Sequence, residues 1–298
     1  MNVSEHPARL SVGVVGAGRV GTALGAALAI AGHRVVAASG VSDAAHERVR
    51  ERLGEEVPMA EPAEVLARAD LALLTVPDDV LPGLVNGLVA VGAPLAGKLL
   101  VHTSGRYGVS VLAPAAREGA LPLALHPVMT FTGRPEDVDR LPSVSFGVTA
   151  PDPLRTVAEA LVVEMGGEPV FIAEEQRALY HAALASGANH LVTLVTEAAG
   201  LLRLAGVEAP ERMLGPLLGA ALDNGLRLGA AGLTGPVARG DAGTVAEHLA
   251  ELRRAAPDAL PAYVAMARLT ADRAMNAGLL KPEDAERLLD VLSNQGVR

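Results

Sequence analysis

The chain has 298 residues, of which 50% are hydrophobic and 20% charged, and its formal net charge at pH 7 is -9. This length is enough to bury a large core and predicts about two domains. The negative charge balance argues against nucleic acid or an anionic membrane as the main partner, because both need concentrated Lys and Arg. With no cysteine in the sequence, disulfides, thiolate catalysis and cysteine metal ligands are excluded.

The start of the chain lacks the apolar segment of a signal peptide, and charged residues, Gly or Pro interrupt every later apolar run. No run reaches the roughly 20 apolar residues that a membrane-spanning helix needs. We therefore expect a cytoplasmic protein without a membrane partner.

A glycine-rich segment stands between two predicted strands near the start of the chain. The apolar run 11–15 leads into Gly16-Ala-Gly-Arg-Val-Gly21, a helical pattern follows over 22–31, and a second apolar run covers 34–38. In such a GxGxxG turn the first glycine closes the turn, the second admits a pyrophosphate and the third packs helix on strand. The pattern predicts a dinucleotide site at Gly16, Gly18, Arg19, Val20 and Gly21.

Apolar and helical segments continue to alternate up to residue 173. Further strands are predicted over 71–76, 99–102, 121–125, 143–149 and 170–173, and helices over 80–91, 109–118 and 153–165. Continuous apolar strands with helical crossovers are typical of a parallel sheet covered on both faces. We predict an α/β, Rossmann-like doubly wound domain over residues 1–173.

From residue 174 onward the pattern is helical throughout, and we predict an all-α domain over 174–298. Its helices are expected over 174–205, 209–228, 241–255, 257–277 and 282–293. A sheet domain followed by a long helix predicts a substrate bound between the two domains. No His, Asp and Glu residues have metal-ligand spacing on one element, so we expect no metal site.

The end of the second strand bears on the choice between NAD and NADP. NAD-binding domains usually place Asp or Glu there, whereas this chain has Ser39. Arg19 or Arg48 could supply positive charge for a 2′-phosphate, although Asp43 lies close by. The pattern favours NADP over NAD, with Ser39 as a cofactor contact or, in the alternative, as an ordinary loop residue. Val76 and Pro77, in the turn after strand 71–76, are further expected cofactor contacts.

Two histidines close predicted strands and so lie at the carboxyl edge of the sheet, where ligands bind. His126 is our first candidate for the proton donor in a hydride transfer, and a structural turn histidine is the alternative. For His102 we favour a structural role, with its neighbour Ser104 as a substrate or nicotinamide contact.

Polar residues at helical spacing mark one side of the long helix. The stripe consists of Ser186, Asn189, Thr193 and Thr196, and His181 precedes it. We expect the stripe to face either a substrate or another helix. Later, Arg239 in the turn 235–241 could hold a carboxylate bidentately or pair with an acidic neighbour.

The chain also resembles a known superfamily. The similarity is carried by Thr75-Val-Pro-Asp78, His102-Thr-Ser-Gly105, Leu125-His-Pro127, Tyr180-His-Ala-Ala183 with Asn189, and Thr234-Gly-Pro-Val-Ala-Arg-Gly-Asp241, beside the glycine motif. These segments resemble two-domain NAD(P)-dependent reductases that include ketopantoate reductase, pyrroline-5-carboxylate reductase and prephenate dehydrogenase. They are most similar to Rossmann-like oxidoreductases with a helical C-terminal domain of unknown function, some of which look like an alternative ketopantoate reductase.

The resemblance implies roles for several residues. His126-Pro127 is similar to the His-Pro segment of prephenate dehydrogenase, where the histidine meets the reacting oxygen of the substrate. His181 and Asn189 are implied as catalytic residues of the long helix, and a homodimer is implied as the assembly. The familiar ketopantoate reductases use a lysine on this helix as proton donor, but this chain has only Lys98 and Lys281, both elsewhere. A lysine mechanism is therefore not expected, and the proton is expected from His126, from His181 or from an ordered water held by Ser104 and Asn189.

We accordingly expect an NADP-dependent oxidoreductase that reduces a small 2-oxo acid, with ketopantoate as the named candidate. Enzymes similar to prephenate dehydrogenase or pyrroline carboxylate reductase are the enzymatic alternatives. A non-catalytic NADP-binding sensor is the alternative from another class. A reduced deazaflavin coenzyme as hydride partner is a further alternative.

Overall fold

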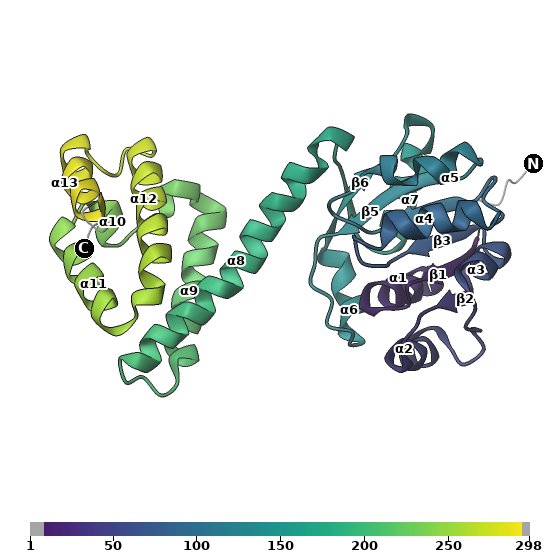
Figure 1. Cartoon of the computed structure of the whole chain (residues 1–298), viewed down its shortest axis with the longest axis horizontal. Helices are drawn as coiled ribbons and strands as arrows, with labels where there is room; N and C mark the ends of the chain where they lie inside the picture. Colours follow the sequence, from purple (N-terminus) through teal and green to yellow (C-terminus); the bar gives the residue numbers. More distant parts are fainter. Residues whose placement is uncertain (1–8, 294–298) are drawn as a thin grey trace, which may run out of the picture. The chain divides into compact units, whose positions relative to one another are not determined.

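The computed structural model describes residues 9–293 and divides them into two compact units (Figure 1). The division lies between Ser186 and Gly187, inside the long helix α8 (Arg177–Leu204). The sequence predicts this boundary earlier, at residue 173. It lies further along because the first turns of α8 pack on the sheet, through contacts of Arg177 and Tyr180.

The first unit is built on one seven-stranded sheet in the order β2-β1-β3-β4-β5-β6-β7. All neighbouring strands run parallel except β5 and β6, which are antiparallel. A sheet dominated by parallel strands confirms the predicted fold class. The antiparallel direction of β6 is a feature that the sequence did not predict. The strands are β1 (Ser11–Val15), β2 (Arg34–Ser39), β3 (Leu71–Leu74), β4 (Leu99–His102), β5 (Leu121–Pro127), β6 (Ser145–Thr149) and β7 (Glu168–Phe171).

Helices cover both faces of this sheet and create two separate apolar cores. One core joins the strands to α1, α2 and α7 through residues such as Leu24 and Val162, and the other joins them to α3, α4 and α5. The helices are α1 (Arg19–Ile30), α2 (Asp43–Leu53), α3 (Pro62–Arg68), α4 (Leu81–Ala90), α5 (Ala113–Arg117), α6 (Glu136–Arg140) and α7 (Arg155–Glu164). Short 3-10 turns are η1 (Val109–Leu112), η2 (Leu141–Ser143), η3 (Asp152–Leu154) and η4 (Glu174–Gln176).

Helix α2 follows the second strand directly and was not predicted from the sequence. It is highly charged and has little apolar periodicity, but Ser42 caps it, with Oγ accepting from the Ala45 amide at 3.2 Å. Helix α1 begins at Arg19 rather than at Thr22, directly after the glycine turn. Both helix starts therefore lie beside the carboxyl ends of β1 and β2.

The second unit is helical, as predicted. Its core is formed by α10 to α13 around Val245, Leu249, Ala271 and Leu288. Over the described residues, no helix combines the length and apolar character that crossing a membrane requires. Besides the end of α8, the elements are α9 (Pro210–Leu228), η5 (Gly229–Gly232), α10 (Pro236–Arg239), α11 (Ala242–Ala255), η6 (Pro257–Ala259), α12 (Leu260–Asn276) and α13 (Pro282–Ser293).

Candidate active site

The glycine turn after β1 is held by hydrogen bonds within the protein. The amides of Gly16 and Ala17 both donate to the Ser39 carbonyl, at 3.0 and 2.8 Å, and the Gly18 amide donates to Gly16 at 2.7 Å. The Thr75 hydroxyl donates to the Gly16 carbonyl at 2.7 Å. The first helical bond of α1 runs from the Thr22 amide to the Gly18 carbonyl. The amides of Arg19, Val20 and Gly21 therefore lack helical partners, an arrangement that suits an anionic group.

The three glycines of the motif have different local surroundings. Gly16 has a φ of 92°, and a Cβ there would lie 2.8 Å from the Thr75 backbone. A Cβ at Gly21 would overlap the Thr75 hydroxyl. At Gly18, in contrast, φ is -80° and the nearest protein atom to a Cβ would be 3.9 Å away. Nothing in the protein itself requires glycine at position 18, so the open space above it fits the close approach of a phosphate.

The end of β2 carries the groups expected to read the cofactor's ribose. Ser39 uses its carbonyl to hold the glycine turn, while its hydroxyl makes no hydrogen bond to a described residue. Arg48, on α2, has a buried Nε without a hydrogen-bond partner, and it is the one such side-chain atom among the described residues. A buried guanidinium nitrogen left without an acceptor fits a site that an anionic group completes.

Val76 and Pro77 follow β3, on the other side of β1. A Cβ at Gly16 would lie 2.9 Å from Val76 Cγ1, so Val76 packs against the glycine turn. Pro77 is exposed. The predicted cofactor residues Gly16, Gly18, Arg19, Val20, Gly21, Ser39, Val76 and Pro77 thus gather at the carboxyl ends of three adjacent strands, β2, β1 and β3.

His126, near the end of β5, is paired with a tyrosine from the start of α8. Its Nδ1 lies 2.8 Å from the hydroxyl oxygen of Tyr180. The ring of His181 stands perpendicular to that of His126, with centroids 6.3 Å apart. Gly105, after β4, makes room for both histidines, because a Cβ there would lie 2.8 Å from His181 and 2.9 Å from His126. The structure therefore brings the predicted residues His126 and His181 together.

His102 and Ser104 lie next to this group but are engaged in structural contacts. His102 is fully buried; its Nε2 lies 2.8 Å from the Gly108 carbonyl, and its Nδ1 accepts from the Ser104 amide at 3.2 Å. The Ser104 hydroxyl accepts from the amides of Arg106 and Tyr107, both at 3.2 Å. His102 has the structural role that we favoured, and Ser104 shapes the turn, so its contact with a substrate stays a prediction.

The buried surroundings keep both histidines neutral at ordinary pH. Burial, together with the charges of Arg177 and His181, lowers the pKa of His126 to about 4, while Asp78 acts in the opposite direction. Burial likewise lowers the pKa of His102 to about 4. Burial also raises the pKa of Tyr180, against the effect of Arg177. Near pH 7 the His126–Tyr180 pair is therefore a neutral imidazole facing a protonated phenol.

Sequence reasoning missed two residues of this site. Arg177 was not singled out, and Tyr180 was quoted only within a family motif. Both belong to the first turn of α8, where Arg177, Tyr180 and His181 stand at positions i, i+3 and i+4 and so share one helix face. That spacing at the start of a long helix was the signal available in the sequence.

The other predicted residues lie further along the chain. Ser186 is an exposed residue of α8 at the end of the first unit. In the second unit Asn189 is exposed, and the Thr193 and Thr196 hydroxyls of the same polar stripe bond to helix carbonyls four residues earlier. Arg239, which ends α10, is exposed and forms no ion pair with a described residue, while its neighbour Asp241 caps α11.

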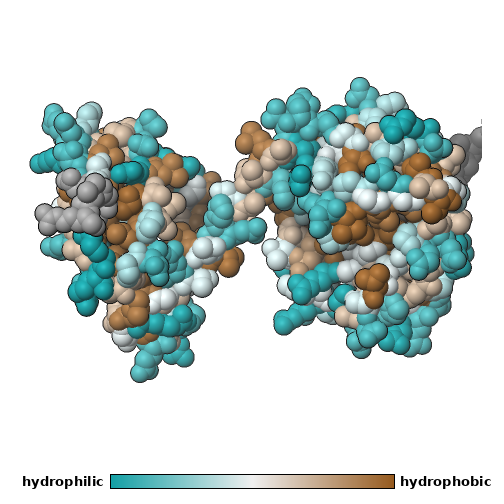
Figure 2. All heavy atoms as spheres, in the orientation of Figure 1, coloured by the Kyte–Doolittle hydropathy of each residue, from teal (hydrophilic) through white to brown (hydrophobic). Residues whose placement is uncertain are grey.

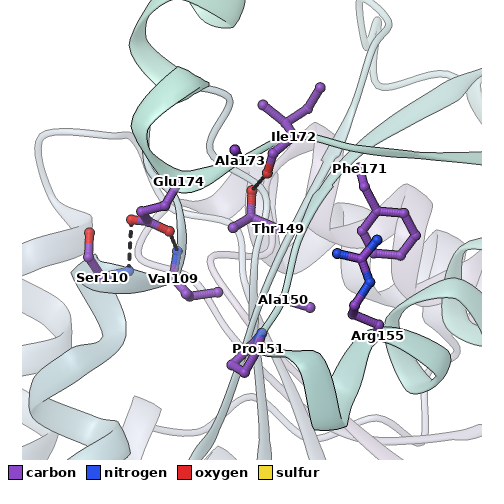
Figure 3. A pocket seen from close by; sticks show the side chains of 10 residues that line it. All are labelled: Val109, Ser110, Thr149, Ala150, Pro151, Arg155, Phe171, Ile172, Ala173 and Glu174. Atoms are coloured by element: carbon purple, nitrogen blue, oxygen red, sulfur yellow. Dashed lines mark hydrogen bonds between the residues drawn. The ribbon is translucent and has the colours of Figure 1, made fainter.

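A cavity of about 510 Å³ lies at the ends of β6 and β7, beside Thr149 (Figure 3). Glu174 on its wall turns both carboxylate oxygens to the amides of Val109 and Ser110, at 2.7 and 3.1 Å. Across the cavity, the Arg155 guanidinium stacks on Phe171, 3.8 Å from the ring centre. Within the described residues, no group of His, Asp and Glu is arranged to hold a metal ion.

Comparisons with known proteins agree with this organisation. Residues 1–127 match a Rossmann-like domain, and residues 144–270 match a domain of unknown function, DUF2520. No curated protein matches the chain.

Solved structures share the fold over most of the chain. BF3122 from Bacteroides fragilis, described as a candidate NADP oxidoreductase, is 23% identical, with 89% of this chain and 98% of that chain covered and a TM-score of 0.72. A reductive aminase from Aspergillus terreus, in complex with NADPH and ethyl levulinate, is 20% identical, with 95% and 99% covered and a TM-score of 0.64. The chain has the fold of NADP-dependent oxidoreductases. Pyrroline carboxylate reductase from Plasmodium falciparum, with NADP bound, shares it at 13% identity, with 94% and 98% covered and a TM-score of 0.58.

Proposed function

We propose that the chain is an NADPH-dependent reductase that converts a C=O or C=N bond of a small carboxylate substrate to the corresponding alcohol or amine. One observation carries this proposal: the phosphate-binding turn and the His126–Tyr180 pair stand at the same edge of one sheet. From β1 to β5 are three strand spacings, about 14 Å at roughly 4.8 Å per strand. A dinucleotide with its pyrophosphate at α1 can extend its nicotinamide over that span.

The residues present fit NADPH. The open face of Gly18 and the free amides at the start of α1 suit the pyrophosphate, while Ser39 and the unpartnered Nε of Arg48 suit a 2′-phosphate. The absence of a carboxylate at the end of β2 favours NADP over NAD. When bound, the nicotinamide supplies the hydride; the protein supplies its position and the proton.

The proton path follows from the tautomers open to the pair. In one tautomer Tyr180 donates its hydroxyl hydrogen to His126 Nδ1, and Nε2–H is then the free donor of the ring. As hydride reaches the substrate carbon, Nε2–H protonates the substrate oxygen or nitrogen and Nδ1 takes the phenolic proton. The imidazole ends neutral in its other tautomer, Tyr180 ends as a phenolate, and water reprotonates it. This relay replaces the lysine donor that the chain lacks.

For the substrate we retain the carboxylate expected from the sequence, with Asn189 and Arg239 as its ligands. The Arg239 guanidinium, which forms no ion pair with a described residue, suits bidentate binding of a carboxylate. Ketopantoate, a 2-oxo acid, and pyrroline-5-carboxylate, a cyclic imine acid, both belong to this class. Two of the structural neighbours are named as a reductive aminase and a pyrroline carboxylate reductase, which favours including substrates with a C=N bond.

The test is NADPH consumption with a matched set of substrates. Ketopantoate, other 2-oxo acids with and without an amine, and pyrroline-5-carboxylate should be assayed with NADPH and with NADH. We expect turnover with at least one member and a loss of about 10²–10⁴-fold in His126→Ala. Tight NADPH binding without turnover on any member would instead favour the sensor function.

A homodimer is part of the proposal, with α9 and the second half of α8 as the contact. These helices expose large apolar side chains, and Figure 2 shows hydrophobic surface at several places on the helical unit. Leu217 and Leu226, both on α9, are 64% and 80% exposed, which is a large exposed fraction for an apolar side chain. Sedimentation analysis should give a dimer for the native chain and a monomer for Leu217→Glu combined with Leu226→Glu. A native monomer would contradict this part of the proposal.

A further inference from the structure

The first residue of α8 is a buried cation without an anionic partner. Arg177 is only 1% exposed. Its Nε donates to Thr149 Oγ1 at 2.7 Å, and one terminal nitrogen donates to the carbonyls of Gly147 and Ala124, at 2.9 and 3.2 Å. The other terminal nitrogen lies 3.5 Å from the Ser104 carbonyl. All four acceptors are neutral, and no carboxylate within the described residues forms an ion pair with Arg177, which is unusual for a charge at this depth.

The charge of Glu174 raises the pKa of Arg177, against the lowering by burial, but neither Glu174 nor Asp78 forms an ion pair with the guanidinium. Glu174 lies three residues before Arg177, and its two carboxylate oxygens accept hydrogen bonds from the amides of Val109 and Ser110 at the start of η1 (Figure 3). Asp78, after β3, acts on His126 and His102 only at a distance. Hydrogen bonds to carbonyls solvate the guanidinium without cancelling its charge, so its field extends into the surrounding site.

The positive charge of Arg177 lies close to the Tyr180–His126 pair. The Arg177 guanidinium carbon is 5.6 Å from the centre of the Tyr180 ring, and the Tyr180 hydroxyl is 2.8 Å from His126 Nδ1. Tyr180 thus lies close to the cation and also contacts His126. The other charged or titratable groups that act on the pair are Asp78, His102 from β4 and His181 from α8, so Arg177 is the only permanent positive charge among them.

We propose that Arg177 is a positioning residue of the reaction, whose unpaired buried charge disfavours a second cation on His126 and stabilises the phenolate that Tyr180 becomes when it gives up its proton. This inference rests on the proposed function. It extends the proposed function by naming the group that makes a tyrosine usable as the proton source. A positive charge near a phenol favours its ionised form, and the same charge disfavours a second cation on His126. One residue therefore acts on both ends of the hydrogen bond.

The alternative is that Arg177 only ties β5, β6 and the turn after β4 together. Two kinds of variant separate these roles. Arg177→Met removes the charge and the hydrogen bonds, and Arg177→Gln removes the charge while keeping a donor for the strand carbonyls. The control is Thr149→Val, which keeps the shape and the cation but removes the acceptor of Nε. The control should lower the melting temperature and leave the electrostatics of the pair unchanged.

The decisive readout is titration of the full chain without substrate. The sequence has three tyrosines and no tryptophan, so phenolate absorbance is clean, and subtracting the Tyr180→Phe curve assigns Tyr180. His126 is followed by NMR and assigned with His126→Ala. Whichever Arg177 variant folds should show a higher pKa for both Tyr180 and His126 than the native chain, whereas Thr149→Val should shift neither. With an active substrate, kcat should fall on the order of 10²-fold in the Arg177 variant.

The outcomes are distinct. Folded Arg177→Gln or Arg177→Met with native titrations of both residues overturns the inference, whatever its activity. Equal shifts in Thr149→Val also overturn it, because the effect would then be structural. Shifted titrations together with no turnover on any substrate would uphold the electrostatic role and count against the proposed function alone.

Discussion

The hydroxyl of Tyr180 lies 2.8 Å from Nδ1 of His126, joining a helix and a strand that are 54 residues apart in sequence. The two rings meet edge to face at 89°, which directs the phenol at the ring nitrogen. His126 Nε2 lies on the other side of the ring, near Gly105. The geometry gives one imidazole a protein partner at one nitrogen and leaves the second nitrogen for a substrate.

Tyr180→Phe should therefore lower kcat by about 10²–10⁴-fold while NADPH binding stays unchanged. The variant removes one oxygen and keeps the ring packing, so the fold should survive. Steady-state kinetics and an NADPH titration measure the two effects. Tyr107→Phe is the matched control and should be fully active. A Tyr180→Phe enzyme with native kcat would remove the phenol from the proton path.

Gly147→Ala should also lower kcat, without changing any titratable group. A Cβ at Gly147, on β6, would overlap the Tyr180 hydroxyl, so the phenol must move away from His126. We expect kcat to fall at least about tenfold, as small misplacements of catalytic groups do. Gly87→Ala on α4, where a Cβ meets nothing within 4 Å, is the control. Equal activity of the two variants would show that the hydrogen bond is not needed.

The pH profile should lack the inflection of an ordinary histidine. Because the pKa of His126 is about 4 rather than 6.5, its Nδ1 stays able to accept a proton until the pH falls toward 4. With a 2-oxo acid substrate, kcat/KM should be level from about pH 5 to pH 8. Circular dichroism must accompany the acid limb, since neutral buried histidines also weaken the fold as pH drops below 6.5. A step near 6.5 in the folded enzyme would contradict the neutral pair.

Gly18→Val should fold normally and lose NADPH binding. Its φ of -80° suits any residue, and the first protein atom is 3.9 Å from the new Cβ, so the added side chain occupies only the phosphate space. Gly21→Ala is the contrasting variant: it should lower the melting temperature, because its Cβ overlaps Thr75. Native NADPH affinity in folded Gly18→Val would rule out the pyrophosphate site.

Cofactor choice tests the end of β2. Arg48→Ala should weaken NADPH more than NADH, and Ser39→Asp should move preference toward NADH by placing a carboxylate near the 2′-phosphate. Each change is expected to alter the ratio of the two dissociation constants by about 10–100-fold, the range of a charge-assisted contact. Arg50→Ala, on the same helix, serves as the control. Unchanged ratios in both variants would place the 2′-phosphate elsewhere.

Much of the fold was predictable because its signals are local. The run of Val12 and Val14, the glycine turn and the alternation of later strands each depend on neighbouring residues, and the structure has them in place. His126 was found because strand ends mark the ligand edge of a parallel sheet. The reversal of β6 was not predictable in this way, since strand direction depends on partners distant in sequence.

The missed residues were missed for a physical reason. Arg177 reads as an ordinary surface arginine, and only the sheet that closes over it makes it buried. Tyr180 gains its role from His126 and from the space left by Gly147, a residue in a different strand. Ser104 presents the reverse case: a hydroxyl beside a histidine suggests a ligand contact, but two backbone amides occupy it.

The glycine turn is complete without its ligand, and this has a kinetic consequence. Every hydrogen bond that shapes it, from Gly16, Ala17 and Gly18 to the Thr75 hydroxyl, is made inside the protein. Capture of the dinucleotide then requires no ordering of this segment, so no conformational step should precede contact with the diphosphate. Mixed rapidly with NADPH, the protein should show an observed rate that rises in proportion to cofactor concentration without reaching a plateau.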